Sequence, residues 1–188
     1  GVDKFVGYDK YPVFSPDGKK IAFRSQRRRG NEADQQRLWV YDLKTNKCDY
    51  ITRGQDYCVT EVAWDGNEAM YFILPWRGTH QVAHIDLRGN MKHITRGNYD
   101  FNTFTFANGK IVANMNSISK AVELYDVNLE NGEFTQITDV NSEIYANIDF
   151  GKVEKRWITT TDGKKMLTWV IYPPHFDPAK KYPTLLYC

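Results

Sequence analysis

The sequence predicts an all-β protein made of about three four-stranded antiparallel units, and three observations carry this prediction. Ile-Thr-Arg-Gly at residues 51–54 recurs at residues 94–97, and Ile-Thr follows again at residues 137–138, each time 43 residues further on. The Asp-Gly turn at residue 65 and the Asn-Gly turn at residue 108 keep the same spacing. The short β-branched and aromatic runs between these landmarks lack the i, i+3, i+4 spacing of a helix. Repeats of about 40–50 residues with four strands each are typical of β-propeller blades.

Each unit is predicted to contain the same elements in the same order. A strand leads into a tight Asp-Gly or Asn-Gly turn, where both residues tolerate positive φ, and a second strand follows. After a loop, a third strand ends in an aspartate (Asp42, Asp86 or Asp126), and a turn leads to a short fourth strand that ends in Ile-Thr. The predicted blades span about residues 11–54, 59–97 and 102–139, and residues 141–150 are predicted to begin another blade. Residues 1–150 are therefore expected to form a partial propeller.

The repeat stops after residue 150, and the remaining residues predict a different arrangement. Residues 153–161 and 165–172 are strand-like and flank an Asp-Gly turn at Asp162, which predicts a β-hairpin. Four of the seven prolines fall within residues 172–183, so this segment is predicted to be extended. A further apolar strand is predicted to begin at Thr184.

The composition indicates a packed protein without a polyanionic partner. Hydrophobic residues make up 41% of the 188 residues and aromatic residues 14%, which disfavours disorder. The 25 basic and 23 acidic residues give a formal net charge of +2, so no nucleic-acid partner is expected. No apolar run approaches the ~20 residues that a membrane-spanning helix needs, so no membrane span is expected.

The cysteine, histidine and serine patterns predict neither a metal site nor a catalytic centre within the chain. Cys48, Cys58 and Cys188 show no Cys-x-x-Cys spacing, and whether Cys48 and Cys58 pair stays open. No Gly-x-Ser-x-Gly element is present, and His84 and His93 are interpreted as ordinary strand residues. No phosphate-binding loop or metal-ligand spacing occurs, so no cofactor and no metal are expected.

The loops between second and third strands are predicted to share one face of the ring, because alternate turns of an antiparallel meander lie at opposite ends of the strands. These loops are residues 24–36, 74–81 and 114–120. The first two contain Arg27, Arg28, Trp76 and Arg77, which are the candidate substrate-recognition residues. The alternative is that these residues belong to an ordinary solvated loop surface.

The segment after the repeats resembles a known family. Its motifs are Thr-Asp-Gly at residues 161–163, Trp-Val-Ile-Tyr at 169–172, Pro-Pro-His-Phe-Asp-Pro at 173–178 and Lys-Lys-Tyr-Pro at 180–183. They are similar to the start of the hydrolase domain in the prolyl oligopeptidase family, and most similar to its dipeptidyl-peptidase IV and acylaminoacyl-peptidase branches. Ser-Pro-Asp-Gly-Lys at residues 15–19 is common in propeller blades of this family and in TolB-like propellers.

The resemblance implies a non-catalytic part of a serine peptidase that hydrolyses short peptides. Residues 151–188 are then the first strands of a truncated α/β-hydrolase domain, and the catalytic triad is expected beyond Cys188. The propeller is expected to gate the active site and to help recognise the peptide substrate. Members of this branch are commonly periplasmic or secreted, and that location is expected here.

Two features leave alternatives open. The adjacent glutamates that hold the substrate's amino terminus in the dipeptidyl-peptidase branch are absent from this sequence, so an acylaminoacyl-type or oligopeptide specificity is also open. The alternative function is a stand-alone TolB-like propeller module that acts through protein–protein contacts. Three blades do not close a ring, because propellers have at least ~4 blades, and open strand edges favour self-association.

Overall fold

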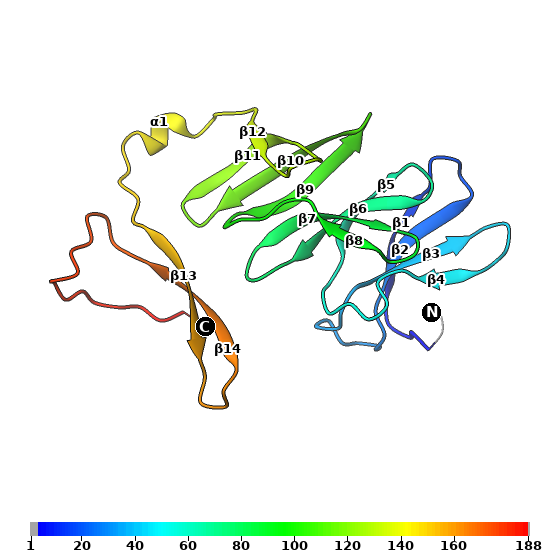
Figure 1. Cartoon of the computed structure of the whole chain (residues 1–188), viewed down its shortest axis with the longest axis horizontal. Helices are drawn as coiled ribbons and strands as arrows, with labels where there is room; N and C mark the ends of the chain where they lie inside the picture. Colours follow the sequence, from blue (N-terminus) through cyan, green and yellow to red (C-terminus); the bar gives the residue numbers. More distant parts are fainter. Residues whose placement is uncertain (1–3, 188) are drawn as a thin grey trace. The chain divides into compact units, whose positions relative to one another are not determined.

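The computed structural model describes residues 4–187, and the first of its two compact units, which ends at Asp139, consists of three four-stranded antiparallel sheets. The strands of each sheet pair in sequence order, so each sheet is a meander (Figure 1). Blade 1 contains β1 (Asp9–Phe14), β2 (Lys20–Ser25), β3 (Arg37–Asp42) and β4 (Cys48–Tyr50). Blade 2 contains β5 (Thr60–Asp65), β6 (Ala69–Pro75), β7 (His80–Asp86) and β8 (Met91–His93). Blade 3 contains β9 (Asp100–Ala107), β10 (Lys110–Ser117), β11 (Lys120–Val127) and β12 (Phe134–Gln136). The predicted all-β fold of about three antiparallel blades is confirmed.

The repeated Ile-Thr pair continues the pairing of the fourth strand with the third in every blade. The isoleucine N–H donates to a third-strand carbonyl, and the threonine hydroxyl accepts a hydrogen bond from the N–H of that same third-strand residue. The isoleucine bonds join Ile51 to Leu38 at 3.0 Å, Ile94 to Val82 at 2.9 Å and Ile137 to Leu124 at 2.8 Å. The hydroxyl bonds join Thr52 to Leu38 at 3.1 Å, Thr95 to Val82 at 2.9 Å and Thr138 to Leu124 at 2.9 Å. The side chain thus pairs a backbone donor, which is buried in blades 1 and 2, and this explains why threonine recurs.

The turn after each third strand is also built alike, but a different type of residue accepts its hydrogen bonds in blade 3. Asp42 and Asp86 each accept backbone N–H bonds from the residues of the following turn. In blade 3 this role belongs to Asn128, whose side-chain oxygen accepts from the N–H of Glu130 at 2.9 Å, and not to Asp126. β11 continues through Val127, one residue beyond Asp126, and the turn follows at residues 129–131.

The blades pack face to face through two apolar clusters. Side chains alternate along a strand, so neighbouring residues of β6 point to opposite faces of blade 2. Phe72 lies in the cluster shared with blade 1, which includes Leu38, whereas Ile73 lies in the cluster shared with blade 3, which includes Phe101. All four side chains are at most 1% exposed. Blade 2 is therefore apolar on both faces, as a central layer must be.

A glycine in the third-to-fourth-strand turn lets each blade approach the preceding one closely. Gly89 of blade 2 has φ +87°, and a Cβ there would lie 2.9 Å from the carbonyl oxygen of Ile51. Gly132 of blade 3 has φ +77°, and a Cβ there would lie 2.0 Å from the carbonyl oxygen of Ile94. The turn therefore needs glycine both for its positive φ and for the space beside the neighbouring Ile-Thr segment.

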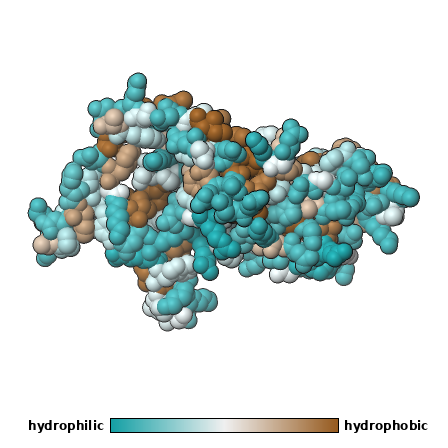
Figure 2. Space-filling model, turned by 45° about the horizontal axis from the view of Figure 1, so that its top comes forward, coloured by the Kyte–Doolittle hydropathy of each residue, from teal (hydrophilic) through white to brown (hydrophobic). Residues whose placement is uncertain are grey.

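The second face of blade 3 exposes apolar side chains at positions that blades 1 and 2 bury. Ile137 is 54% exposed, whereas its counterparts Ile51 and Ile94 are 5% and 8% exposed. Val112 and Leu124 on the same face are also exposed. Figure 2 shows such apolar residues at the surface among largely hydrophilic ones.

The second compact unit begins at Val140 and contains one hairpin and one helical turn. The hairpin pairs β13 (Val153–Thr159) with β14 (Lys165–Ile171) in antiparallel register, as predicted. The helix α1 (Ser142–Tyr145) lies where another blade was predicted to begin, and residues 141–150 contain no strand. The N–H of Tyr145 donates to the carbonyl of Asn141, so a local turn satisfies the backbone here without a partner strand. The division of the chain at residue 150 stays a prediction.

The end of the chain also differs from the predicted pattern. No strand forms between Thr184 and Tyr187, and Leu185 is 99% exposed. A strand needs a neighbour to pair its backbone groups, and no other described segment pairs with these residues. Within residues 4–187, the structure contains no helix of the length and apolarity that crossing a bilayer requires.

Candidate functional site

The β2–β3 and β6–β7 loops, together with the segments that connect one blade to the next, lie at the same end of the strands. This follows from the antiparallel order, in which alternate connections lie at opposite ends. We call this end the loop face. It contains all four residues that the sequence singles out, and it also contains the arginines of the two Ile-Thr-Arg-Gly segments.

Arg27 and Arg28 lie at an exposed loop tip that a buried aspartate holds in place. Asp34 accepts a hydrogen bond from the backbone N–H of Arg28 at 2.7 Å, and its carboxylate lies 3.8 Å from the Arg28 guanidinium. Arg37 approaches the same carboxylate at 3.5 Å. Burial alone would raise the pKa of Asp34, but the backbone N–H groups of Arg28 and Arg27 and the charge of Arg37 hold that pKa below its usual value. The loop tip is therefore ordered, with Arg27 free to face solvent.

Trp76 and Arg77 form a stacked pair at the tip of the β6–β7 hairpin. The guanidinium carbon of Arg77 lies 5.3 Å from the centre of the Trp76 ring, and that ring lies 4.5 Å from the ring of His93. Arg77 adopts φ +51°, and Gly78 follows with φ +72°. A guanidinium that rests on an aromatic ring loses little freedom when it binds an anion, because its orientation is already restricted.

His93 and Arg96 join this pair, and the sequence analysis missed both. Burial lowers the pKa of His93, and the charges of Arg96 and Arg77 lower it further. The charges of two nearby guanidinium groups thus disfavour protonation of this imidazole, and its Nδ1 is buried with no hydrogen-bond partner among the described residues. Arg96 could have been found from the Ile-Thr-Arg-Gly repeat, but the stacking of His93 on Trp76 has no signal in the sequence.

Five arginines on the loop face form no ion pair within residues 4–187. They are Arg27, Arg29, Arg53, Arg77 and Arg96, and all five are exposed. The guanidinium carbon of Arg53 lies 5.2 Å from the centre of the Tyr50 ring, which repeats in blade 1 the stacking seen at Arg77. Guanidinium groups bind carboxylates through paired, charge-assisted hydrogen bonds. The loop face is therefore suited to binding carboxylates.

The four predicted residues form two separate groups. Trp76 and Arg77 share one cluster, whereas Arg27 and Arg28 belong to the loop of the neighbouring blade. In the part of the chain that the structure describes, no hydrogen bond or ion pair joins the two loops.

A buried arginine marks the seam between blades 1 and 2. Arg24 is 7% exposed, its guanidinium carbon lies 3.7 Å from the centre of the Tyr11 ring, and its Nη1 donates to the carbonyl of Val59 at 3.3 Å. Burial lowers the pKa of Arg24, while Tyr11 and Glu61 act in the opposite direction. Tyr11 and Glu61 both lie in bulges of first strands, with φ +57° and +45°. Bulges re-aim side chains, and here they bring Tyr11 and Glu61 close to the guanidinium.

The described residues provide no metal centre and no disulfide. Within residues 4–187, no group of three or more His, Cys, Asp and Glu side chains is arranged to hold a metal ion. Cys48 and Cys58 are both free thiols, which answers the question that the sequence left open. Cys188 lies outside the described residues.

Comparisons with known proteins agree with this architecture. The model of the family described as the dipeptidyl peptidase IV N-terminal region matches residues 13–167. Dipeptidyl-peptidase 5 of Porphyromonas gingivalis is 40% identical over 185 residues, which cover 97% of this chain and 27% of that protein. The chain thus spans about a quarter of the length of this relative.

Solved structures show the same fold. The Pyrococcus horikoshii acylaminoacyl peptidase matches with a TM-score of 0.72 at 20% identity, over 92% of this chain and 26% of that chain. The β-propeller domain of the Trilobed protease from Pyrococcus furiosus matches with a TM-score of 0.56 at 26% identity, over 73% of this chain and 40% of that chain. Both similarities support the assignment of the three sheets as propeller blades.

Proposed function

The chain belongs to the family of the dipeptidyl peptidase IV N-terminal region, and from this premise we propose that it is a non-catalytic propeller portion of a serine peptidase. The observation that supports this most is the 40% identity to a dipeptidyl peptidase over 97% of the chain. The chain contains no Gly-x-Ser-x-Gly element, so the catalytic serine of the proposed enzyme lies outside these 188 residues. This match favours a peptidase over a stand-alone binding module.

We further propose that the loop face helps to recognise the peptide substrate. The stacked guanidinium of Arg77 is the best-placed donor, because Trp76 restricts it and no carboxylate among the described residues neutralises it. Its partner in a peptide would be a carboxylate, either the C-terminus or an acidic side chain. Gating of the active site, self-association through the exposed face of blade 3, and a periplasmic or secreted location stay predictions.

The experiment uses the full-length protein that contains this chain, assayed on short peptides with free and with amidated C-termini. We expect release of dipeptides or of single blocked residues, and inhibition by a serine-directed fluorophosphonate. Arg77→Met is expected to raise KM about fivefold for peptides with a free C-terminal carboxylate, and to leave kcat unchanged, because a charge-assisted hydrogen bond contributes about 1 kcal/mol at an exposed site.

The matched control is Arg88→Met, which removes an exposed arginine of the same blade at the opposite end of the strands, in the β7–β8 turn. This variant is expected to keep the wild-type KM for both kinds of peptide. If the full-length protein hydrolyses no peptide, the proposed function is wrong. If it does so and Arg77→Met and Arg88→Met behave alike, the function stands and the recognition role of the loop face is wrong.

A further inference from the structure

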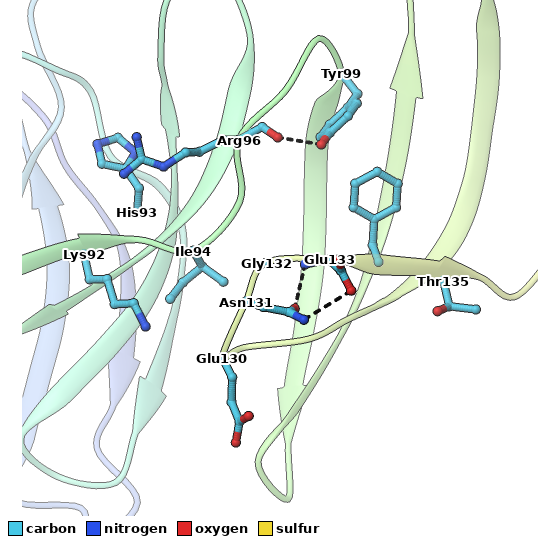
Figure 3. Close-up of a pocket in the computed structure, with 11 residues that line it drawn as sticks. Lys92, His93, Ile94, Arg96, Tyr99, Glu130, Asn131, Gly132, Glu133 and Thr135 are labelled. Carbon is cyan, nitrogen blue, oxygen red and sulfur yellow. Dashed lines mark hydrogen bonds between the residues drawn. The ribbon is translucent and has the colours of Figure 1, made fainter.

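A groove between blades 2 and 3 has the features of a second peptide-binding site, and Arg96 is the one arginine of the loop face that also lines it. The groove has a volume of about 640 Å³, which lies in the usual range of ligand pockets. Its lining comes from the end of β8 and the segment that follows it, and from the β11–β12 turn with β12 (Figure 3). The groove thus lies beside the edge strands of both sheets, β8 and β12.

The blade 3 side of the groove is acidic, and the turn holds one of its two carboxylates, that of Glu133. The side-chain amide of Asn131 donates to the Glu133 carboxylate at 3.2 Å, and the Asn131 side-chain oxygen accepts from the N–H of Glu133 at 2.9 Å. Asn128 fixes the backbone at Glu130. Gly132 lies against the carbonyl of Ile94, so the turn has little room to move. Neither Glu130 nor Glu133 forms an ion pair within residues 4–187.

The blade 2 side contributes less positive charge than its composition suggests. Figure 3 shows that the side chain of Arg96 extends toward His93, away from the acidic turn. The coupling of Arg96 to the pKa of His93 agrees with this placement. Lys92 is therefore the one cation of the described residues that lines the groove and faces the turn (Figure 3). The lining as a whole has two carboxylates and two cations, but because Arg96 points toward His93, the side of the groove next to the turn has an excess of negative charge.

An ordered aromatic pair forms the end of the groove. The rings of Tyr99 and Phe134 meet edge to face with centres 4.8 Å apart, and the Tyr99 hydroxyl donates to the carbonyl of Arg96 at 2.5 Å. Tyr99 and Phe134 also line a second hollow of about 370 Å³. Met115 and Tyr125 add further apolar surface there. An aromatic pair that borders two hollows suits neighbouring side chains of an extended peptide, which alternate in direction.

We propose that this groove binds a basic side chain, lysine or arginine, of an extended peptide. The methylene groups of that side chain pack on Tyr99 and Phe134, and its cationic end is neutralised by Glu133. A neighbouring side chain of the peptide enters the second hollow. The choice of a peptide as ligand rests on the proposed function, whereas the preference for a basic side chain rests on the charge and shape of the groove.

The test is an NMR titration of the 188-residue chain with tripeptides blocked at both ends. Acetyl-Ala-Lys-Ala-amide is expected to bind about fivefold more tightly than the uncharged isostere acetyl-Ala-norleucine-Ala-amide, and to shift the amide signals of residues 130–135. Ala-Ala-Ala-amide with a free amino terminus has a terminal ammonium but no cationic side chain, so it tests whether any positive charge is enough. It is expected to bind no better than the norleucine peptide.

Three variants make the assignment specific. Glu133→Gln is expected to weaken binding of the lysine peptide about fivefold, and Lys92→Met to tighten it about twofold, because a competing cation is removed. Glu32→Gln, an exposed glutamate of the β2–β3 loop, is the control and is expected to change nothing. The proposal is overturned if no peptide binds, if lysine and norleucine peptides bind alike, or if Lys92→Met weakens binding. The titration needs no hydrolysis, so its failure leaves the proposed function standing.

Discussion

Replacing Gly132 with alanine is expected to destabilise the chain by about 2–4 kcal/mol. An alanine in the left-handed region costs about 1 kcal/mol, and a forced overlap in a packed region adds about 1–3 kcal/mol. The added Cβ would lie 2.0 Å from the carbonyl oxygen of Ile94, which is a backbone atom of the neighbouring blade and has no rotamer to change. Blades 2 and 3 would have to separate where Gly132 meets the carbonyl of Ile94. Urea unfolding of the chain followed by tryptophan fluorescence gives the loss of free energy.

Gly109→Ala is the matched control for this prediction. Gly109 has φ +73°, almost the value at Gly132, but a Cβ there would meet no atom within 4 Å. This variant is expected to lose only the stability that an alanine at positive φ costs, about 1 kcal/mol. Equal losses in the two variants would show that the close contact between the blades does not exist, and would contradict the packing described here.

The second large effect is expected at the buried threonine of the second Ile-Thr pair, where Thr95→Val should cost about 2–3 kcal/mol. Thr95 is fully buried, and its hydroxyl accepts from the N–H of Val82 and donates to the side-chain oxygen of Gln81, both at 2.9 Å. Valine keeps the shape but leaves both buried groups without this partner, and an unsatisfied buried polar group costs about 1–3 kcal/mol. Thermal and urea unfolding measure the loss.

Two further variants separate the hydroxyl from the shape of the side chain. Thr95→Ser keeps the hydroxyl and is expected to recover part of the loss. Thr105→Val changes an exposed strand threonine on β9 and is expected to remain within about 0.5 kcal/mol of the unchanged chain. A Thr95→Val variant as stable as Thr105→Val would mean that the repeated threonine has no structural role.

The sequence was informative wherever a local pattern decides the structure. The 43-residue spacing of Ile-Thr predicted the blades because the threonine hydroxyl and the isoleucine N–H close each sheet against its own third strand. The Asp-Gly turn at Asp162 predicted the hairpin of β13 and β14 for the same reason, since both strands lie close in the sequence.

The predictions were wrong where the structure depends on which segments pair or on where a strand ends. The third strand of blade 3 was predicted to end in Asp126, but β11 runs one residue further, to Val127, and Asn128 accepts the N–H bond of the turn. A strand was predicted after Thr184, but no described segment pairs with it there. Apolar character alone does not make a strand when its backbone has no partner.

The candidate site was predicted only in part. Trp76 and Arg77 lie on the loop face as predicted, because the meander order fixes which end a loop occupies. The stacking of His93 on Trp76 and the contact of Arg24 with Tyr11 join residues from different strands or blades. Such contacts depend on the orientation of the side chains, and neither the composition nor the spacing of the sequence motifs contains that information. Whether the four predicted residues recognise substrate stays a prediction.

The central claim is that successive 43-residue units are equivalent blades, each related to the next by a rotation about a common axis. Arg53, Arg96 and Asp139 occupy equivalent exposed positions at the end of the three blades. Spin labels at pairs of these positions, in a chain whose native cysteines are replaced by serine, give three distances by pulsed electron paramagnetic resonance. We expect the 53–96 and 96–139 distances to be equal and the 53–139 distance to be shorter than their sum. Unequal neighbouring distances, or a 53–139 distance equal to the sum, would contradict a propeller.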